Sequence, residues 1–212
     1  MSLLFPNKCI LCGKILERSE TDLCHACRVD SPECPVRNQK RTFLDSWVAI
    51  WYYKGYIRSS ILRYKFGRAR HYAHGYGRIL AMKRAGEYPE GFDVLTWIPI
   101  SPIRKFFRGY DQVELLAKAV GRELNMEPQR TLRKIRHNRP QAGIHGAAER
   151  RANVLGVYRM AKNADVLDKR VLLLDDVMTT GATAGEAARI LLTAGAKEVH
   201  LGCIAAAHSD KK

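Results

Sequence analysis

The fold of this chain is decided by Val171-Leu-Leu-Leu-Asp-Asp-Val-Met-Thr-Thr-Gly-Ala-Thr183. The first four residues are a continuous apolar run, which is typical of a strand covered on both faces in a parallel sheet. Asp175 and Asp176 follow at the carboxyl end of that strand, where open α/β sheets bind their ligands. We therefore expect the two acids to belong to a binding site.

The second half of this stretch predicts a loop that binds one phosphate. Such a loop offers backbone N–H groups, hydroxyls and the positive end of a helix dipole. Its residues are Thr179, Thr180, Gly181, Ala182 and Thr183. Thr183 and Glu186 also have the spacing of a capping box. The alternative is a strand that ends in a solvated turn with ordinary capping residues.

The remaining C-terminal pattern completes an α/β unit. A helix is expected from Ala184 to about Ala194, because Gly195 is a good helix stop. Residues 198–204 then predict a final strand. Only eight residues follow it, so we expect the pocket for a second substrate to come from the N-terminal half.

Two Cys-x-x-Cys pairs near the N-terminus have the spacing of a zinc ribbon. Four thiolates, from Cys9, Cys12, Cys24 and Cys27, can bind one tetrahedral ion. His25 is a weaker alternative ligand. Disulfides are the other alternative, but they need an exported protein, and the sequence begins without the pattern of a secretory leader. We therefore expect structural Zn²⁺ and a cytoplasmic protein.

The length and composition favour one core of ordinary size with a small metal-stabilised module. The chain has 212 residues, of which 46% are hydrophobic, and no apolar run approaches membrane-spanning length. We expect the zinc ribbon at residues 1–36. A single α/β domain with a mostly parallel sheet and flanking helices is expected at residues 37–212.

The basic charge is concentrated in the middle of the chain. The net charge is +15, from 36 basic and 21 acidic residues, and the excess lies within residues 37–84 and 101–159. Such blocks can neutralise the phosphates of a polyanion. The sequence therefore favours nucleic acid as a partner, with solvated helix faces in a basic protein as the alternative.

Aromatic residues alternate with these charges. Residues 47–53 alternate as a strand does, so one face could lie in the core while the other stacks bases. Core packing is the expected fate of any single ring. A helix is expected after Gly55. The candidate nucleic-acid ligands are Arg58, Arg63 and Lys65, together with Arg136 and Arg139 of a later basic segment, residues 133–154.

Residues 94–102 predict a second strand, whose end Pro99 and Pro102 force into a loop. Arg104 and Arg108 follow, and guanidinium groups suit the oxygens of a diphosphate. Simple surface charge is the alternative. Residues 111–124 then have apolar side chains at helical spacing, which predicts an amphipathic helix packed on the sheet.

The stretch from Asp175 to Thr183 resembles the phosphoribosyl-diphosphate (PRPP) loop of type I phosphoribosyltransferases. This resemblance implies that both acids are catalytic and bind the ribose hydroxyls, that the loop binds the 5′-phosphate, and that Mg²⁺ accompanies the diphosphate. It also implies that Ser101 lies in a diphosphate loop and that residues 133–154 form a mobile loop. Thr179 replaces the carboxylate common in purine-salvage members, so a general base is missing there.

The order of motifs along the whole chain is similar to the ComF family. The motifs are the double Cys-x-x-Cys module, Tyr64-Lys-Phe66, Ile98-Pro-Ile-Ser101, Arg108-Gly-Tyr-Asp-Gln112, Arg139-Pro-Gln141, Arg151-Ala-Asn153 and the loop at 175–183. The resemblance implies a competence protein that handles incoming single-stranded DNA, alone or with other DNA-uptake proteins. An active phosphoribosyltransferase of nucleotide metabolism without a DNA role, and a DNA adaptor with a relic sugar-phosphate site, are the alternatives. Turnover and the acceptor stay open.

Overall fold

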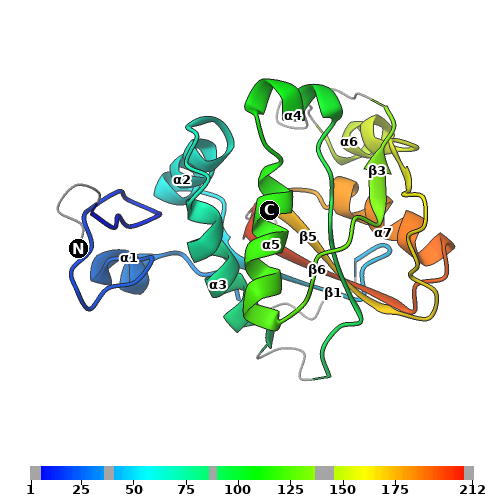
Figure 1. Cartoon of the computed structure of the whole chain (residues 1–212). Helices are drawn as coiled ribbons and strands as arrows, with labels where there is room; N and C mark the ends of the chain where they lie inside the picture. Colours follow the sequence, from blue (N-terminus) through cyan, green and yellow to red (C-terminus); the bar gives the residue numbers. More distant parts are fainter. Residues whose placement is uncertain (1–5, 36–40, 86–89, 137–145, 208–212) are drawn as a thin grey trace.

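A four-stranded parallel sheet forms the centre of the molecule (Figure 1). The computed structural model describes residues 6–35, 41–85, 90–136 and 146–207. The strand order is β1-β6-β5-β2, with β1 at Ser46–Tyr52, β6 at Glu198–Ala206, β5 at Arg170–Met178 and β2 at Val94–Trp97. All predicted strands are therefore present, and they form one parallel sheet.

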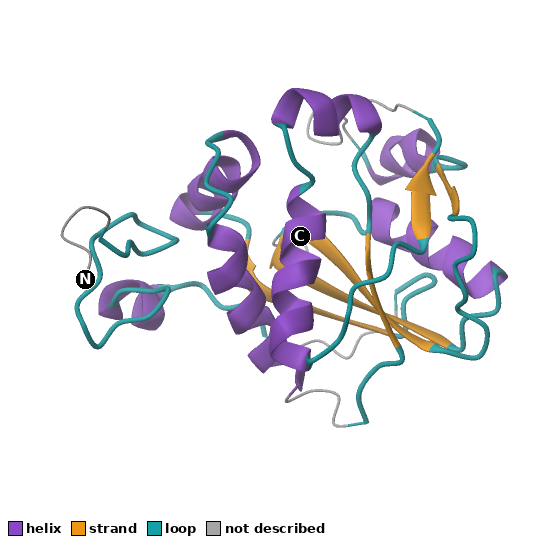
Figure 2. Cartoon of the chain, viewed as in Figure 1, coloured by secondary structure: helices purple, strands orange, loops and turns teal. Residues whose placement is uncertain are grey.

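Helices cover both faces of this sheet (Figure 2). On one face, Leu172 and Leu174 share a core with α3 (Tyr72–Ala85) and α5 (Gln112–Leu124). On the other face, Leu173 packs in a core with α7 (Ala182–Thr193). Helices α3 and α5 pack closely at Gly77, where an added Cβ would lie 2.4 Å from the Cβ of Ala119. The continuous apolar run of β5 is thus explained by burial on both sides.

Strand β1 does not have the base-stacking face that its alternation suggested. Trp47 belongs to the core beside α7, whereas Trp51 belongs to the core beside α3 and α5, and both are buried. Its outer edge is also covered, since Cys34 N donates to Ile50 O at 3.0 Å and Tyr52 N donates to Pro32 O at 2.9 Å. The prediction of a strand is confirmed, and of the two alternatives for its rings the structure shows core packing rather than base stacking for Trp47 and Trp51.

The cysteine-bearing segment packs against α2 (Gly55–Phe66) and α3, and contains the short helix α1 (His25–Asp30). Ile10 and Leu11 share the core of α2 and α3. Ser60 Oγ and the Arg63 guanidinium donate to the backbone carbonyls of these two residues. An ion pair of 3.1 Å between Arg78 and Asp22 lies at the same junction. The segment is therefore anchored to the main body by apolar, polar and ionic contacts.

The basic region predicted as one long loop is partly ordered into regular structure. Strand β3 (Leu132–Lys134) pairs antiparallel with β4 (Tyr158–Met160), and α6 (Ala147–Val154) lies between them in sequence. Leu132 and Val154 are buried, which explains why these ends fold onto the domain. Residues 137–145 lie outside the described part of the chain.

The predicted amphipathic helix is confirmed as α5. Asp111 is its N-cap, and its Oδ1 accepts hydrogen bonds from Val113 N at 2.9 Å and Glu114 N at 3.2 Å. The other helix near the site is α4 (Pro102–Arg108). Among the described residues, no helix has both the length and the apolar character needed to cross a membrane.

Candidate functional site

The two acids lie within the last part of β5. The strand continues through Asp175 and Asp176 to Met178, so it is longer than the predicted apolar run. Asp176 is buried and Asp175 is half-buried. The backbone N–H of Asp176 donates to Asp175 Oδ1 at 2.8 Å. The sheet thus holds two neighbouring carboxylates at its carboxyl edge, which is where parallel sheets bind ligands.

Two residues from different helices contact Asp176. Lys65, on α2, places Nζ 2.7 Å from Oδ1. Gln112, the first residue of α5, donates from Nε2 to Oδ2. Lys65 was expected among the nucleic-acid ligands, but the structure places it on this acid. Gln112 was not among the predicted site residues, and its only sequence signal is its position at the end of the Arg108–Gln112 motif.

The electrostatics of the acid pair favour a cation. Burial, and then the charge of Asp176, raises the pKa of Asp175, and Lys65 opposes this effect. The raised pKa means that the surroundings do not fully compensate the negative charge of the ionised Asp175 carboxylate. Carboxylate oxygens are ligands that Mg²⁺ accepts, so the donor set of Asp175 and Asp176 fits that ion.

The predicted phosphate loop follows directly. Gly181 has φ +79° and is the N-cap of α7, and this left-handed conformation suits glycine. The helix begins at Ala182, two residues earlier than expected. Thr180 Oγ1 accepts from Ala182 N at 3.4 Å. Thr179 is exposed, while the other loop residues are half-buried. The first turn of α7 therefore follows the acid pair directly in the chain, and a helix N-terminus of this kind suits an anion.

The capping box that the sequence suggested is not formed. The Glu186 carboxylate accepts from Gly156 N at 2.9 Å and pairs with Arg189, with Nε at 2.9 Å and Nη2 at 3.0 Å. Glu186 therefore ties α7 to the segment after α6. Because Gly181 is the N-cap, Thr183 is already inside the helix and lies outside the capping position.

Arg41 lies beside this loop and was missed by the sequence reasoning. Its Nη1 donates to Thr180 O at 3.3 Å, and its guanidinium carbon is 5.2 Å from the centre of the Trp47 ring. It comes from a part of the chain that the sequence marked only as basic. Arg41, which precedes β1 in the sequence, thus places its positive charge next to the phosphate loop.

A second wall of the site comes from α4 and the β3–β4 ribbon. Lys134 lies with Nζ 5.4 Å from the Tyr158 ring centre. Burial, and then the neighbouring charge of Arg104, lowers the pKa of Lys134 to about 8, while Asp175 raises it. Burial likewise lowers the pKa of Arg104. Lys134 therefore interacts electrostatically with both Arg104 and Asp175, although only the last two were predicted as site residues.

The other predicted diphosphate ligands have different positions. Ser101 is buried and its hydroxyl accepts from Arg104 N at 3.3 Å, so it is the N-cap of α4. Arg108 donates to the side-chain oxygen of Gln112 and lies 4.9 Å from the centre of the Phe66 ring. Arg104 thus belongs to the wall of the site. Arg108 lies between Gln112, which contacts the acid pair, and the ring of Phe66.

The predicted nucleic-acid ligands are dispersed. Arg58 is exposed on α2. Arg63 donates to Leu11 O and lies 6.0 Å from the Tyr72 ring centre. Arg136 donates to Leu155 O at 2.9 Å, and Arg139 lies outside the described residues. Of these arginines, none that lies within the described residues is brought together with the acid pair.

The four cysteines converge as their spacing predicts. The sulfurs of Cys9, Cys12, Cys24 and Cys27 all lie within 4.8 Å of one another, and the Sγ atoms of Cys12 and Cys24 are 3.7 Å apart. A tetrahedral zinc ion with Zn–S bonds of 2.3 Å needs sulfurs roughly 3.8 Å apart. The donor set therefore fits zinc. His25 is not in the group and is exposed.

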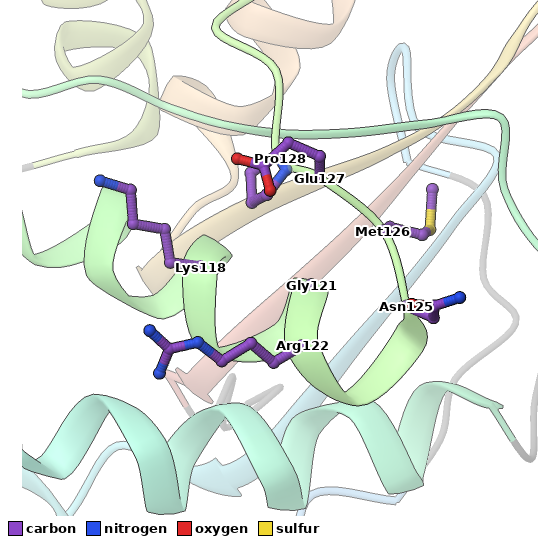
Figure 3. A pocket seen from close by; sticks show the side chains of 7 residues that line it. All are labelled: Lys118, Gly121, Arg122, Asn125, Met126, Glu127 and Pro128. Carbon is purple, nitrogen blue, oxygen red and sulfur yellow. The ribbon is translucent and has the colours of Figure 1, made fainter.

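A separate pocket lies at the far end of α5. Its volume is about 540 Å³, and it is lined by Lys118, Gly121, Arg122, Asn125, Met126, Glu127 and Pro128 (Figure 3). Arg122 is ten residues beyond Gln112, or about 15 Å along the helix at 1.5 Å per residue. This pocket therefore lies apart from the acid pair.

Known proteins align with most of this sequence at low identity. A family model described as "Phosphoribosyl transferase domain" matches residues 114–212. Competence protein F of Haemophilus influenzae is 25% identical over 233 residues, which cover 98% of this chain and 100% of the relative. Competence protein ComFC of Streptococcus pneumoniae is 28% identical, with 91% and 96% covered. DNA utilization protein YhgH of Escherichia coli is 26% identical, with 95% and 98% covered.

Among solved structures, the chain is similar to glutamine PRPP amidotransferase from B. subtilis. The identity is 22% and the TM-score is 0.44, with 66% of this chain and 30% of the enzyme covered. The chain thus spans less than a third of that enzyme. The relatives named for competence and DNA utilization match nearly from end to end, and the phosphoribosyltransferase model spans the acid pair and its loop. Relatives named for competence and DNA utilization over most of the chain, together with the phosphoribosyl transferase domain, therefore support the ComF family, and the chain has a type I phosphoribosyltransferase fold.

Proposed function

We propose that this ComF-family protein is a cytoplasmic competence protein that binds PRPP with Mg²⁺, and also binds single-stranded DNA. The observation that carries the PRPP proposal is the pair Asp175 and Asp176 at the edge of β5, directly followed by the Gly181 turn at the start of α7. Four cysteines grouped as metal ligands, rather than as spaced disulfide pairs, agree with a cytoplasmic location.

The proposed roles follow the positions of the side chains. The two acids accept hydrogen bonds from the ribose hydroxyls, and residues 179–183 bind the 5′-phosphate through N–H groups and hydroxyls. Arg104 and Lys134 face the diphosphate. Bound Mg²⁺ neutralises charge on the diphosphate as it leaves. Lys65 and Gln112 orient Asp176 before the substrate arrives.

A second candidate function is an active phosphoribosyltransferase of nucleotide metabolism without a DNA role. It is favoured by the cationic wall, because Arg104 and Lys134 stand where a leaving diphosphate needs compensation. In that reaction the bond between ribose C1 and diphosphate breaks, diphosphate keeps the electron pair, and an acceptor bonds to C1 and releases its proton to solvent. Binding of single-stranded DNA separates the two functions, because only the first one includes it.

The N-terminal module completes the proposal. Residues 1–36 form a structural zinc ribbon and residues 37–212 form the phosphoribosyltransferase-like domain. The support is the convergence of four cysteines and the shared core through Ile10 and Leu11. Zinc binding then stabilises the segment that packs on α2, because ligand binding to the folded state adds to its stability.

Calorimetric titration tests the proposed site. PRPP with Mg²⁺ is titrated into the wild type and into Asp175→Asn, with and without a single-stranded oligonucleotide. We expect binding by the wild type and loss of binding in the variant, with unchanged zinc content and circular dichroism. Absence of binding by the wild type would overturn the PRPP proposal and leave a relic site. Absence of oligonucleotide binding at physiological salt would favour the purely metabolic function.

A further inference from the structure

Helix α4 carries an apolar face that is exposed to solvent. Ile103, Phe106 and Phe107 recur at helical spacing, and both phenylalanines are 83% exposed. Their ring centres are 5.6 Å apart in an edge-to-face arrangement. The helix lies at the periphery of the molecule, above the helices that cover the sheet (Figure 1). Two neighbouring exposed phenylalanines on one helix mark a contact surface.

The end of α2 extends this surface. Phe66, its last residue, is 68% exposed, and the Arg108 guanidinium lies 4.9 Å from its ring centre. Arg70 donates to Gly109 O at 3.4 Å and lies 4.7 Å from the Tyr110 ring centre. These contacts join α2 to α4. We call the surface formed by Phe66, Ile103, Phe106 and Phe107 the aromatic platform.

The charge around the aromatic platform is positive. Residues 54–74 and 94–110, which form it, contain no acidic residue. Within the described ranges, Arg68, Arg70 and Arg108 make no ion pair with a carboxylate, whereas Lys105 pairs with Glu114 at 2.9 Å. Exposed rings beside guanidinium groups whose charge is not balanced by a carboxylate in the described ranges fit a partner that has both flat apolar faces and negative charge. Single-stranded nucleic acid has both, because its unpaired bases stack and its phosphates bind arginine.

Contacts connect the aromatic platform to the acid pair. Lys65 precedes Phe66 in sequence and pairs with Asp176 at 2.7 Å. Arg108 donates to Gln112, and Gln112 donates to Asp176. Phe66 of the platform is therefore next in sequence to Lys65, which contacts the acid pair. Arg108 reaches the acid pair through one further side chain, that of Gln112. A polynucleotide on the platform has its sugar-phosphate groups next to a site built for a sugar phosphate.

We propose that the aromatic platform stacks the bases of single-stranded DNA, with Arg68 and Arg70 binding its phosphates. This inference rests on the proposed function, since DNA binding belongs to it, and it moves the DNA contact to a surface other than the arginines indicated by sequence. Duplex DNA fits less well, because its bases are already stacked on one another. An apolar protein partner fits less well too, because the cores of protein interfaces are depleted of charge.

The test is fluorescence anisotropy with a labelled oligothymidylate of about 16 nucleotides and with the matching duplex, over a series of salt concentrations. The variants are Phe106→Ala/Phe107→Ala and Phe66→Ala, with Leu167→Ala as the control. Leu167 is also exposed, at 69%, but it lies before β5, at the opposite end of the strand from the acids. Loss of stacking by two rings predicts roughly a tenfold or greater loss of affinity for the single strand.

Arg70→Gln tests the phosphate contact separately. We expect the slope of log affinity against log salt to become shallower by about one, which corresponds to the loss of one phosphate contact, with little change in base preference. Titration of PRPP with Mg²⁺ into the double phenylalanine variant should give the wild-type affinity, because the two rings do not contact the acid pair. An unchanged salt slope in Arg70→Gln would overturn its assigned role.

The outcomes separate the surface from the function. If the wild type does not bind the oligonucleotide, the proposed DNA-binding function is wrong. If the wild type binds it and the double variant binds equally well, the platform is wrong and the function stands. Loss of duplex binding as large as the loss for the single strand would overturn stacking. The platform is also overturned if the double variant keeps DNA binding but loses binding to phosphatidylglycerol vesicles or to a protein partner.

Discussion

Lys65 Nζ lies 2.7 Å from Asp176 Oδ1, and both side chains are largely removed from solvent, at 20% and 8% exposure. This ion pair joins α2 to β5 across the edge of the sheet where the ribose is proposed to bind. It also places a lysine between the exposed Phe66 and the buried acid. A substrate that bonds to Asp176 must therefore share this carboxylate with Lys65.

Replacing Lys65 by methionine should destabilise the protein by about 3 kcal/mol, because removal of one partner leaves a buried carboxylate without its cation. Urea unfolding at neutral pH measures this difference. Lys105→Met is the matched control: Lys105 pairs with Glu114 at 2.9 Å, but its side chain is 54% exposed. An exposed pair contributes about 1 kcal/mol or less. Equal losses of stability in the two variants would show that burial does not strengthen the Lys65–Asp176 pair.

Lys134 should make anion binding depend on pH. Its pKa is lowered to about 8 by burial and then by Arg104, and a bound diphosphate would raise that pKa. The contribution of Lys134 to affinity is therefore complete below pH of about 8 and is lost as the pH rises above this value toward the higher pKa of the bound state. Diphosphate with Mg²⁺ is titrated at pH 7 and pH 9 into the wild type and Lys134→Met.

Comparison of the wild type with Lys134→Met isolates the effect of Lys134 on affinity, since Asp175 titrates in both proteins. We expect the wild type to lose roughly tenfold more affinity than Lys134→Met over this range, the equivalent of one pKa unit. Parallel pH profiles for the two proteins would show that Lys134 does not face the diphosphate.

The cysteine group predicts a metal-dependent module. Cys9→Ser should lower the zinc content from one ion per chain, measured by mass spectrometry of the purified protein, and should lower the melting temperature. The reason is that Cys9 and its neighbours Ile10 and Leu11 share a core with α2 and α3. Cys34→Ser is the control, because Cys34 is buried outside the cysteine group. Full zinc content in Cys9→Ser would refute the site.

Gly181→Ala should weaken binding of the 5′-phosphate. Alanine at φ +79° costs about 1 to 2 kcal/mol in the left-handed region, and its Cβ would lie 3.4 Å from Nη1 of Arg41. Gly91→Ala is the matched control, with φ +70° and no atom within 4 Å of its Cβ. Both variants should lose similar stability in urea unfolding. Only Gly181→Ala should lose affinity for PRPP, and equal affinity in both would contradict the loop assignment.

Local pattern in the sequence determined the elements that carry the site. The apolar run before Asp175, the Gly181 turn and the following helix are set within a few residues of one another, so their strand, loop and helix were predictable. The cysteine spacing likewise determined the metal group, because each Cys-x-x-Cys pair fixes two sulfurs locally. The type of each of these features was predicted correctly, whereas boundaries such as the start of α7 were not.

Tertiary structure decided which distant residues meet these elements. Arg41, Lys65, Gln112 and Lys134 come from four separate segments, and only the sheet order β1-β6-β5-β2 with its covering helices brings them to one edge. Trp47 alternates as a half-exposed strand would, yet chain segments cover both faces and the edge of β1. Sequence periodicity describes one element at a time, whereas burial and charge pairing depend on what packs against it.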